Sequence, residues 1–298
     1  MSAHCGSASS SGFMNFRIVF RNSTTLELNR ILYIDRAFVV VNKPANFVTQ
    51  YPKDGQTEAV AELEGTIPSA PSLTKLYPVH RLDKGTTGCL VFARSLAHAQ
   101  AFSQQFHQRT VQKIYHALVD TSSSRSLATG VTSGVIRVGM ALKNGRPYLS
   151  RSEAARETST DWQIIGSNLQ AHASLMKLHL HTGMKHQLRV HMSEALQAPI
   201  IGDWQHSLSR SSPQKLSIPN DRMFLHASEI SFHRFRRAGK HKRLNLTLRA
   251  PLPQDFTEFC IRAGIQAPLC LLRGGLFVDG QPVEEVADLA GFWIANAE

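Results

Sequence analysis

Alternating apolar and polar residues predict several strands along the chain. The segments 113–119, 176–180 and 244–248 follow a two-residue period, so each strand has one buried side and one solvent-facing side. The runs 37–41 and 88–92 are almost wholly apolar and are bounded by Pro or Gly. These two runs are typical of strands that are buried on both faces.

Apolar residues at helical spacing predict three helices. Ser95 can cap a helix over 96–106, a second helix covers 188–196, and a third spans 255–262. Loops are predicted at 121–134 and 207–220. Strands outnumber helices and show no regular βαβ alternation, so we predict an α+β fold with a mixed, largely antiparallel central sheet flanked by helices.

The chain divides into three parts by composition. Residues 1–30 are an N-terminal extension, 31–262 carry the pattern of a folded domain, and 263–298 form a C-terminal tail of unknown role. The first 26 residues have Arg, many Ser and Thr, and no acid, which is the composition of a mitochondrial targeting segment. An untargeted terminus in a cytoplasmic or nuclear protein is the alternative. Uncharged apolar runs never reach the roughly 18 residues of a membrane span.

The charge balance indicates the class of partner. Lys and Arg total 33 against 22 Asp and Glu, which gives a net charge of +11 and a pI near 9.8. Such an excess favours binding to a polyanion, because cations release the counterions condensed on phosphates, although it also serves solubility. The four cysteines form no Cys-x-x-Cys pair, so we expect a reducing compartment and buried thiols.

Asp83 differs from the other carboxylates because it lies among cations and glycines. It belongs to the turn-forming segment 79–88, which leads directly into an apolar strand, and Arg81 and Lys84 are beside it. A carboxylate displayed at the start of a rigid strand is a candidate nucleophile. The alternative is a turn residue whose side chain bonds its own backbone.

Arg189 and several histidines lie in the segment 180–191, which runs from a strand into a helix. A zinc site here is disfavoured, because His186 and His191 are five positions apart and diverge by about 140° on a helix. We therefore expect no metal, and we interpret these side chains as solvent-facing or core histidines. The histidines in and beside this segment are His179, His181, His186 and His191.

Two further segments combine cations with an aromatic residue. The predicted strand 113–119 places Lys113 and Tyr115 on one face. The segment 233–243 holds six Lys or Arg in eleven residues without an acid, and Gly239 marks a hairpin turn within it. Cations interleaved with an aromatic ring suit a nucleic-acid backbone, whereas a solvated hairpin tip is the alternative.

Taken in order, these segments resemble the RluA-type family of RNA pseudouridine synthases over residues 31–262. The most specific match is His80-Arg81-Leu82-Asp83-Lys84 with Thr86-Thr87-Gly88, which is similar to the catalytic His-Arg-Leu-Asp motif of the family. The supporting matches are 41–44, 113–119, 182–191, 199–203, 225–227 and 250–253. The chain departs from the family pattern at Asn46, where Gly is usual, and at Met184-Lys185, where Arg-Thr is usual.

The resemblance implies an isomerase that converts a uridine of ribosomal or transfer RNA to pseudouridine without a metal or an organic cofactor. Asp83 would attack C1′ of the ribose or C6 of the uracil, and Arg189 would pair with it. Tyr115 would stack on the uracil and is a candidate for removing the C5 proton. Leu188 would wall the pocket, and Arg81 would fill the space that the flipped base leaves. Further RNA contacts are expected from His80, Lys113, Lys185, Arg236, Arg237 and Lys240, in a protein we expect to be a monomer.

Two other functions are weighed against this one. A non-catalytic RNA-binding protein or RNA chaperone would use the same basic surface without turnover. A metal-dependent nuclease or hydrolase would pair Asp83 with Asp203 through histidines, although Asp203 is more simply explained as closing a turn after Gly202.

Overall fold

A computed structural model describes residues 17–20, 24–27, 31–49, 61–64, 76–207, 218, 222–236 and 242–294. Most of the described strands belong to one fifteen-stranded sheet. Its main path runs through β10 (Arg146–Leu149), β9 (Ser133–Lys143), β11 (Arg156–Asn168), β12 (Ala173–Leu180), β8 (Gln112–Asp120), β13 (Leu225–Phe235), β7 (Thr87–Ala93), β4 (Phe38–Lys43), β3 (Ile31–Ile34), β18 (Gly291–Trp293) and β17 (Glu285–Val286). Off this path lie β14 (Arg243–Arg249), β15 (Gly275–Val278), β16 (Gln281–Val283) and β6 (Tyr77–Pro78).

A second sheet and a few short helices complete the described structure. Three strands form the small sheet, namely β2 (Thr24–Glu27), β1 (Arg17–Phe20) and β5 (Ala61–Glu64). The helices are α1 (Leu96–His107), α2 (Arg125–Ala128), α3 (Gln187–Val190), α4 (Gln254–Arg262), α5 (Leu269–Arg273), the π-helical turn His191–Ala195 and the 3-10 turn Ala287–Leu289. Within the described strands only β7 and β13 pair in parallel, so the predicted α+β fold with a largely antiparallel sheet is confirmed.

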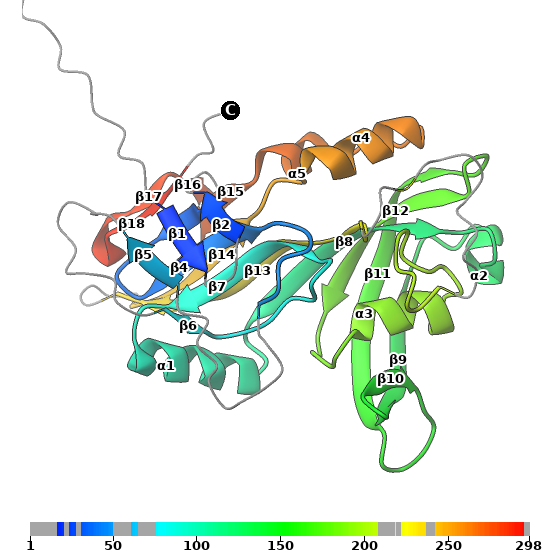
Figure 1. Cartoon of the computed structure of the whole chain (residues 1–298), viewed down its shortest axis with the longest axis horizontal. Helices are drawn as coiled ribbons and strands as arrows, with labels where there is room; N and C mark the ends of the chain where they lie inside the picture. The colour runs from blue at the N-terminus through cyan, green and yellow to red at the C-terminus, as the bar shows by residue number, and fades with distance from the viewer. Residues whose placement is uncertain are drawn as a thin grey trace, which may run out of the picture.

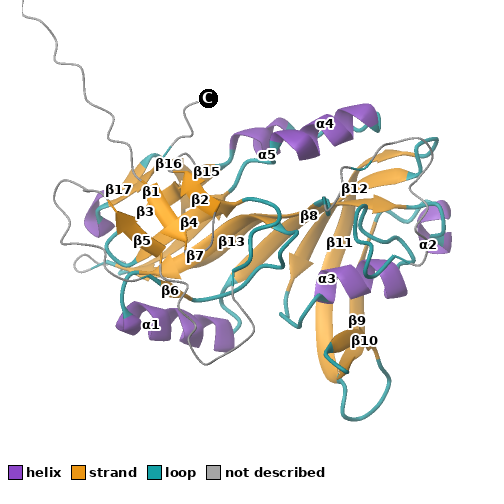
Figure 2. Cartoon of the chain, in the orientation of Figure 1, coloured by secondary structure: helices purple, strands orange, loops and turns teal. Residues whose placement is uncertain are grey.

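The sheet has two halves that meet at β13, which pairs with both β8 and β7. In Figure 1, α1 lies beside β6 in one half and α3 lies against β11 in the other. Figure 2 shows how few helices accompany this extended sheet. The close approach of β7 to β13 requires Gly88, because a Cβ there would lie 2.2 Å from the Ala227 carbonyl oxygen.

The three predicted helices are present, and two of them match their end signals. The Ser95 hydroxyl accepts a hydrogen bond from the amide of His98 and begins α1, and α4 stops before Gly264, where φ is +67°. The third helix departs from its pattern, because its second half is a π-helical turn. The wider turn rotates Ala195 to the solvent, although the period predicts that it faces the core.

Other expectations need correction. The predicted loop 121–134 contains α2 and the start of β9, while most of 207–220 lies outside the described residues. Residues of the predicted tail join the main sheet, because β15 pairs with β14 and β18 pairs with β3. Cys89 and Cys260 are buried as expected, Cys270 is exposed, and Cys5 lies outside the described residues. Among the described helices none is long and apolar enough to span a bilayer.

Candidate active site

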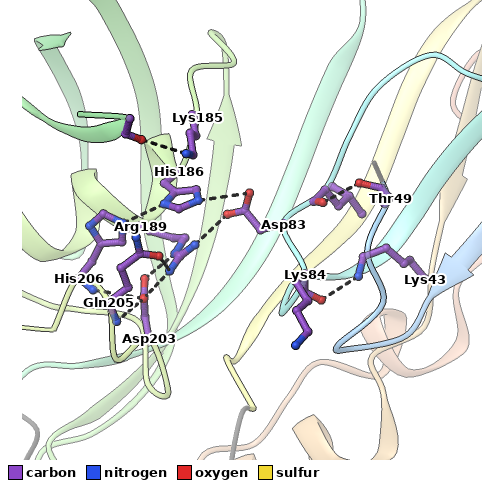
Figure 3. A network of polar contacts seen from close by, with 12 residues as sticks. Lys43, Thr49, Asp83, Lys84, Lys185, His186, Arg189, Asp203, Gln205 and His206 are labelled. Carbon is purple, nitrogen blue, oxygen red and sulfur yellow. Dashed lines mark hydrogen bonds and ion pairs between the residues drawn. The ribbon is translucent and has the colours of Figure 1, made fainter. Parts of the chain in front are cut away.

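The loop between β6 and β7 presents Asp83 and is fixed on both sides of it. The Thr49 hydroxyl donates to the carbonyl of Leu82 at 2.9 Å, and Lys43 Nζ donates to the carbonyl of Lys84 at 3.0 Å. Lys43 is fully buried and also donates to two carbonyls of its own loop, so all three of its N–H groups are used. The backbone around Asp83 is therefore held by β4 and the loop that follows it (Figure 3).

The side chain of Asp83 makes few contacts. Its Oδ2 accepts a hydrogen bond of 3.2 Å from Nη1 of Arg189, and its Oδ1 lies 3.9 Å from Nε2 of His186. The Asp83 carbonyl closes a turn by accepting from the amide of Thr86, so the turn involves only the backbone. The Asp83 side chain is 21% exposed, and the turn of its own loop does not use its carboxylate oxygens.

Arg189 reaches Asp83 from the other half of the sheet, at the end of α3. Its Nε and Nη2 each donate to the carboxylate of Asp203 at 2.7 Å. Burial opposes the charge of Arg189, but the hydrogen bonds and charge of Asp203, together with Asp83, raise the pKa of the guanidinium. Asp203 is 2% exposed and fully engaged, so it serves as the anchor of Arg189.

A cavity of about 900 Å³ opens beside Asp83, and a pocket of this size can hold a nucleotide. Eight of the residues predicted from the sequence line it. These are His80, Arg81, Asp83, Lys113, Tyr115, Lys185, Leu188 and Arg189. The structure therefore brings together segments that lie up to 109 positions apart, from His80 to Arg189.

The walls of the cavity differ in charge. Leu188 and Tyr115 are buried, and Tyr115 belongs to the apolar core on this face of the sheet. Burial lowers the pKa of Lys113 to about 8, while its Nζ lies 5.5 Å from the centre of the Phe106 ring. Burial, and after it the charge of Asp83, raises the pKa of the Tyr115 hydroxyl, which keeps this phenol neutral at neutral pH.

Two predicted RNA-contacting residues have structural partners. Nε2 of His80 accepts from the amide of Val91 at 2.9 Å, and burial lowers the His80 pKa to about 3. Nζ of Lys185 donates to the carbonyl of Gly145, in the turn between β9 and β10. His80 is thus a neutral support of the Asp83 loop, while Lys185 remains exposed at the rim of the cavity.

The predicted basic hairpin is only partly described. Nε of Arg236 lies 3.2 Å from Oδ2 of Asp288, and Arg236 does not line the cavity. Arg237 and Lys240 lie outside the described residues. The pairing with Asp288 was not visible in the sequence, because 52 residues separate the two side chains.

Several polar residues lie beside Asp83 and Arg189 although the sequence pattern assigned them no role there. Gln187 connects loop 182–186 to β11, since its side chain bonds the hydroxyls of Thr182 and Thr160. His186 Nδ1 lies 3.0 Å from Nε2 of His206, and burial lowers the His186 pKa to about 4 against the charge of Asp83. His186 and Gln187 stand in the motif that marked Arg189, but nothing local indicates the partner of either side chain.

The histidines considered as metal ligands separate into different environments. His191 is fully buried between the hydroxyls of Thr158 and Thr160, at 2.9 and 3.0 Å. His179 on β12, His181 just after its end and Asp161 on the neighbouring β11 do gather, with ligand atoms within 4.8 Å of one another. All three side chains are at least 31% exposed, and His181 already bonds Asp161 at 2.8 Å. This group is sufficiently explained as a surface hydrogen-bonded pair with a neighbouring imidazole.

The family described as RNA pseudouridylate synthase matches residues 37–194, which include Asp83, Tyr115 and Arg189. The chain belongs to this family. The RluA-type resemblance is thereby confirmed, and the protein is an isomerase of the pseudouridine synthase class.

Two relatives and one solved structure show how far the similarity extends. The tRNA pseudouridine synthase C of Haemophilus influenzae is 32% identical over 220 residues, covering 68% of this chain and 86% of the relative. The mitochondrial pseudouridylate synthase RPUSD4 of Xenopus tropicalis is 29% identical over 275 residues, covering 80% and 82%. The structure of human RNA pseudouridylate synthase domain containing 4 is 28% identical with a TM-score of 0.60, covering 80% of this synthase and 94% of that chain.

Proposed function

We propose that this synthase isomerises a specific uridine of a ribosomal or transfer RNA, with Asp83 as the nucleophile. The observation that carries the proposal is the open carboxylate of Asp83 at a cavity of about 900 Å³, held by a single guanidinium nitrogen at 3.2 Å. The name of one relative, a tRNA pseudouridine synthase, supports tRNA as a substrate class, and the name of the other supports a mitochondrial location.

The first step requires the uridine to leave its base stack and enter the cavity. Flipping costs roughly a few kcal/mol, and Arg81 at the mouth of the cavity is the side chain we assign to the vacated space. The uracil then stacks on the Tyr115 ring, with Leu188 as an apolar wall. Asp83 then attacks either C1′ of the ribose or C6 of the uracil, and both routes use the same carboxylate as nucleophile.

The isomerisation then needs a proton to move within the base. The glycosidic N1–C1′ bond breaks, the uracil turns, and C5 bonds to C1′ as Asp83 is released. The product carries a hydrogen on N1 and none on C5, so one neutral acid can give a proton to N1 and recover the C5 proton. The raised pKa of Tyr115 leaves its phenol protonated in the resting enzyme, which is the form that this shuttle requires.

Nuclease chemistry is poorly supported by the same geometry. Asp203 binds Arg189 through both oxygens and also accepts from two backbone amides, which leaves it unavailable to a metal ion. We expect activity to persist in EDTA and the RNA to stay uncut. Loss of activity in EDTA, or strand cleavage, would support the hydrolase instead.

Substrate and compartment can be mapped together. Pseudouridines are mapped in cytosolic and organellar RNA from cells that lack the protein, and from the same cells expressing either wild-type protein or Asp83→Ala. The proposal predicts that at least one site in rRNA or tRNA disappears and returns only with the wild type. The mitochondrial relative and the N-terminal composition lead us to propose mitochondrial RNA. Return of that site with Asp83→Ala would show that Asp83 is not the nucleophile.

A further inference from the structure

Two chains of contacts start at Asp203 and end on the two oxygens of Asp83. One chain is Arg189, which binds Asp203 and donates to Oδ2 of Asp83. The other passes through His206, whose amide donates to Oδ1 of Asp203 at 3.3 Å. Nε2 of His206 lies 3.0 Å from Nδ1 of His186, and Nε2 of His186 faces Oδ1 of Asp83 at 3.9 Å. Figure 3 shows the two chains converging on one carboxylate.

The hydrogen bond between the two imidazoles carries one proton, and Asp83 decides which ring donates it. If Nδ1 of His186 held the proton, the neutral ring would turn a bare Nε2 toward the Asp83 carboxylate. If Nε2 of His206 donates instead, His186 accepts at Nδ1 and presents its Nε2–H to Asp83. The negative charge of Asp83 favours the second arrangement.

A doubly protonated His186 is disfavoured by its surroundings. Burial of the ring and the positive charges of Arg189 and Lys185 oppose a cation there, as does His206, whereas only Asp83 favours it. The lowered pKa of about 4 keeps His186 neutral at neutral pH. The choice of tautomer is therefore the property that His206 can control.

The backbone of His186 points to the same conclusion. Its φ is +52°, in the left-handed region that a residue with a side chain seldom adopts, at the position just before α3. Its side chain is only 12% exposed, between Asp83 and His206. A conformation of this kind persists where the surrounding contacts require it, and here it aims an imidazole at Asp83.

We propose that His206 is a positioning residue, which donates its Nε2–H to His186 and so fixes the tautomer that presents an N–H to Oδ1 of Asp83. The inference rests on the proposed role of Asp83 as the nucleophile. At 3.9 Å the last contact is not yet a hydrogen bond, and catalytic contacts of this kind shorten when substrate binds. Held at both oxygens, the carboxylate keeps one orientation toward the uridine.

A matched pair of variants tests the donor. His206→Gln places an amide N–H near the position of Nε2, while His206→Leu fills similar space without a donor. On RNA transcribed with uridine tritiated at C5, we expect His206→Leu to lower kcat about tenfold with KM unchanged. His206→Gln should restore most of the rate. Equal rates for His206→Leu and wild type, or no difference between the two variants, would overturn the proposal.

A second measurement reads the tautomer directly in the full-length protein. With 15N-labelled histidine, the nitrogens of His186, assigned by comparison with His186→Gln, should be protonated at Nε2 and bare at Nδ1. His206→Leu should remove that preference, and a protonated Nδ1 in the wild type would contradict the proposal. This result is independent of turnover: an active Asp83→Asn would end the nucleophile assignment but would not alter the tautomer measured in the wild-type protein, whereas a failure confined to the His206 variants would leave the assignment of Asp83 as nucleophile in place.

Discussion

Asp35 and Asp83 each bind an arginine in this synthase, yet of these two only Asp83 is open to a substrate. Asp35, after β3, is 1% exposed. Its oxygens accept five hydrogen bonds, from the hydroxyl of Tyr33, the amides of Ala37 and Phe38, and two nitrogens of Arg234. Asp83 accepts one hydrogen bond, from Arg189, and borders a large cavity.

The difference lies in the lone pairs that the protein leaves unused. A carboxylate has about four acceptor positions, and those of Asp35 are filled by groups that the fold must keep in place. Asp83 is held instead through the backbone of its neighbours, because Lys43 and Thr49 bond the carbonyls of Lys84 and Leu82, so its carboxylate oxygens remain available. An ion pair alone therefore does not mark a reactive aspartate; the number of donors and the neighbouring cavity do.

The largest stability effect should come from Asp35→Asn. Removing this charge leaves Arg234 unpaired in a largely buried site, which costs about 3–5 kcal/mol. Asp83→Asn should change the free energy of unfolding by no more than about 1 kcal/mol, because its single hydrogen bond is partly solvated. Urea unfolding of both variants measures the two values. Equal losses would remove the distinction between a structural and a reactive aspartate.

Substitutions of Tyr115 separate its stacking from its proton transfer. Tyr115→Phe retains the ring, so RNA affinity should hold while kcat falls by about 10²–10⁴ for loss of the acid and base. Tyr115→Leu also loses base stacking, which is worth about 1–3 kcal/mol and should raise KM. Tritium release and filter binding give both quantities. A fully active Tyr115→Phe would show that another group moves the C5 proton.

The smallest change, counted per unit of pH, should be a pH dependence of the free energy of unfolding that arises at Lys43, beside the Asp83 loop. Burial lowers the pKa of Lys43 to about 7, whereas an unfolded lysine titrates near about 10.4. Between these values the unfolded chain binds more protons, so this group raises the free energy of unfolding with pH, by at most about 1.4 kcal/mol per unit. The free energy of unfolding is measured against pH for the wild type and for Lys43→Met, and the difference between the two curves isolates the contribution of Lys43. If this difference in the free energy of unfolding fell as the pH rose from about 7 to about 10.4, the lowered pKa of Lys43 would be contradicted.

Much of the site could be predicted because the decisive residues occur in short local patterns. Asp83 precedes an apolar strand, Tyr115 lies within one, and Arg189 follows the turn into a helix. Each pattern marks its own residue, and the family resemblance groups them. For this reason eight residues named from the sequence lie on the wall of the cavity.

What could not be predicted depends on contacts between distant segments. Asp203 and His206 approach Arg189 and His186 across 14 and 20 positions, through turns without a periodic signal. Asp288 meets Arg236 across 52 positions, in a C-terminal region whose strands are too short to show a period. The π-helical turn after α3 has no signal in the sequence, since the apolar residues there are spaced as in an α-helix.

The measurement that tests the account most directly compares tritium release by Asp83→Asn and Asp35→Asn on the same C5-tritiated RNA. Activity is normalised to the folded fraction of each variant. The open carboxylate predicts a fall of at least about 10³-fold for Asp83→Asn, the scale seen when a nucleophile is removed, and near wild-type release by folded Asp35→Asn. Release by Asp83→Asn at the wild-type rate would contradict the central claim.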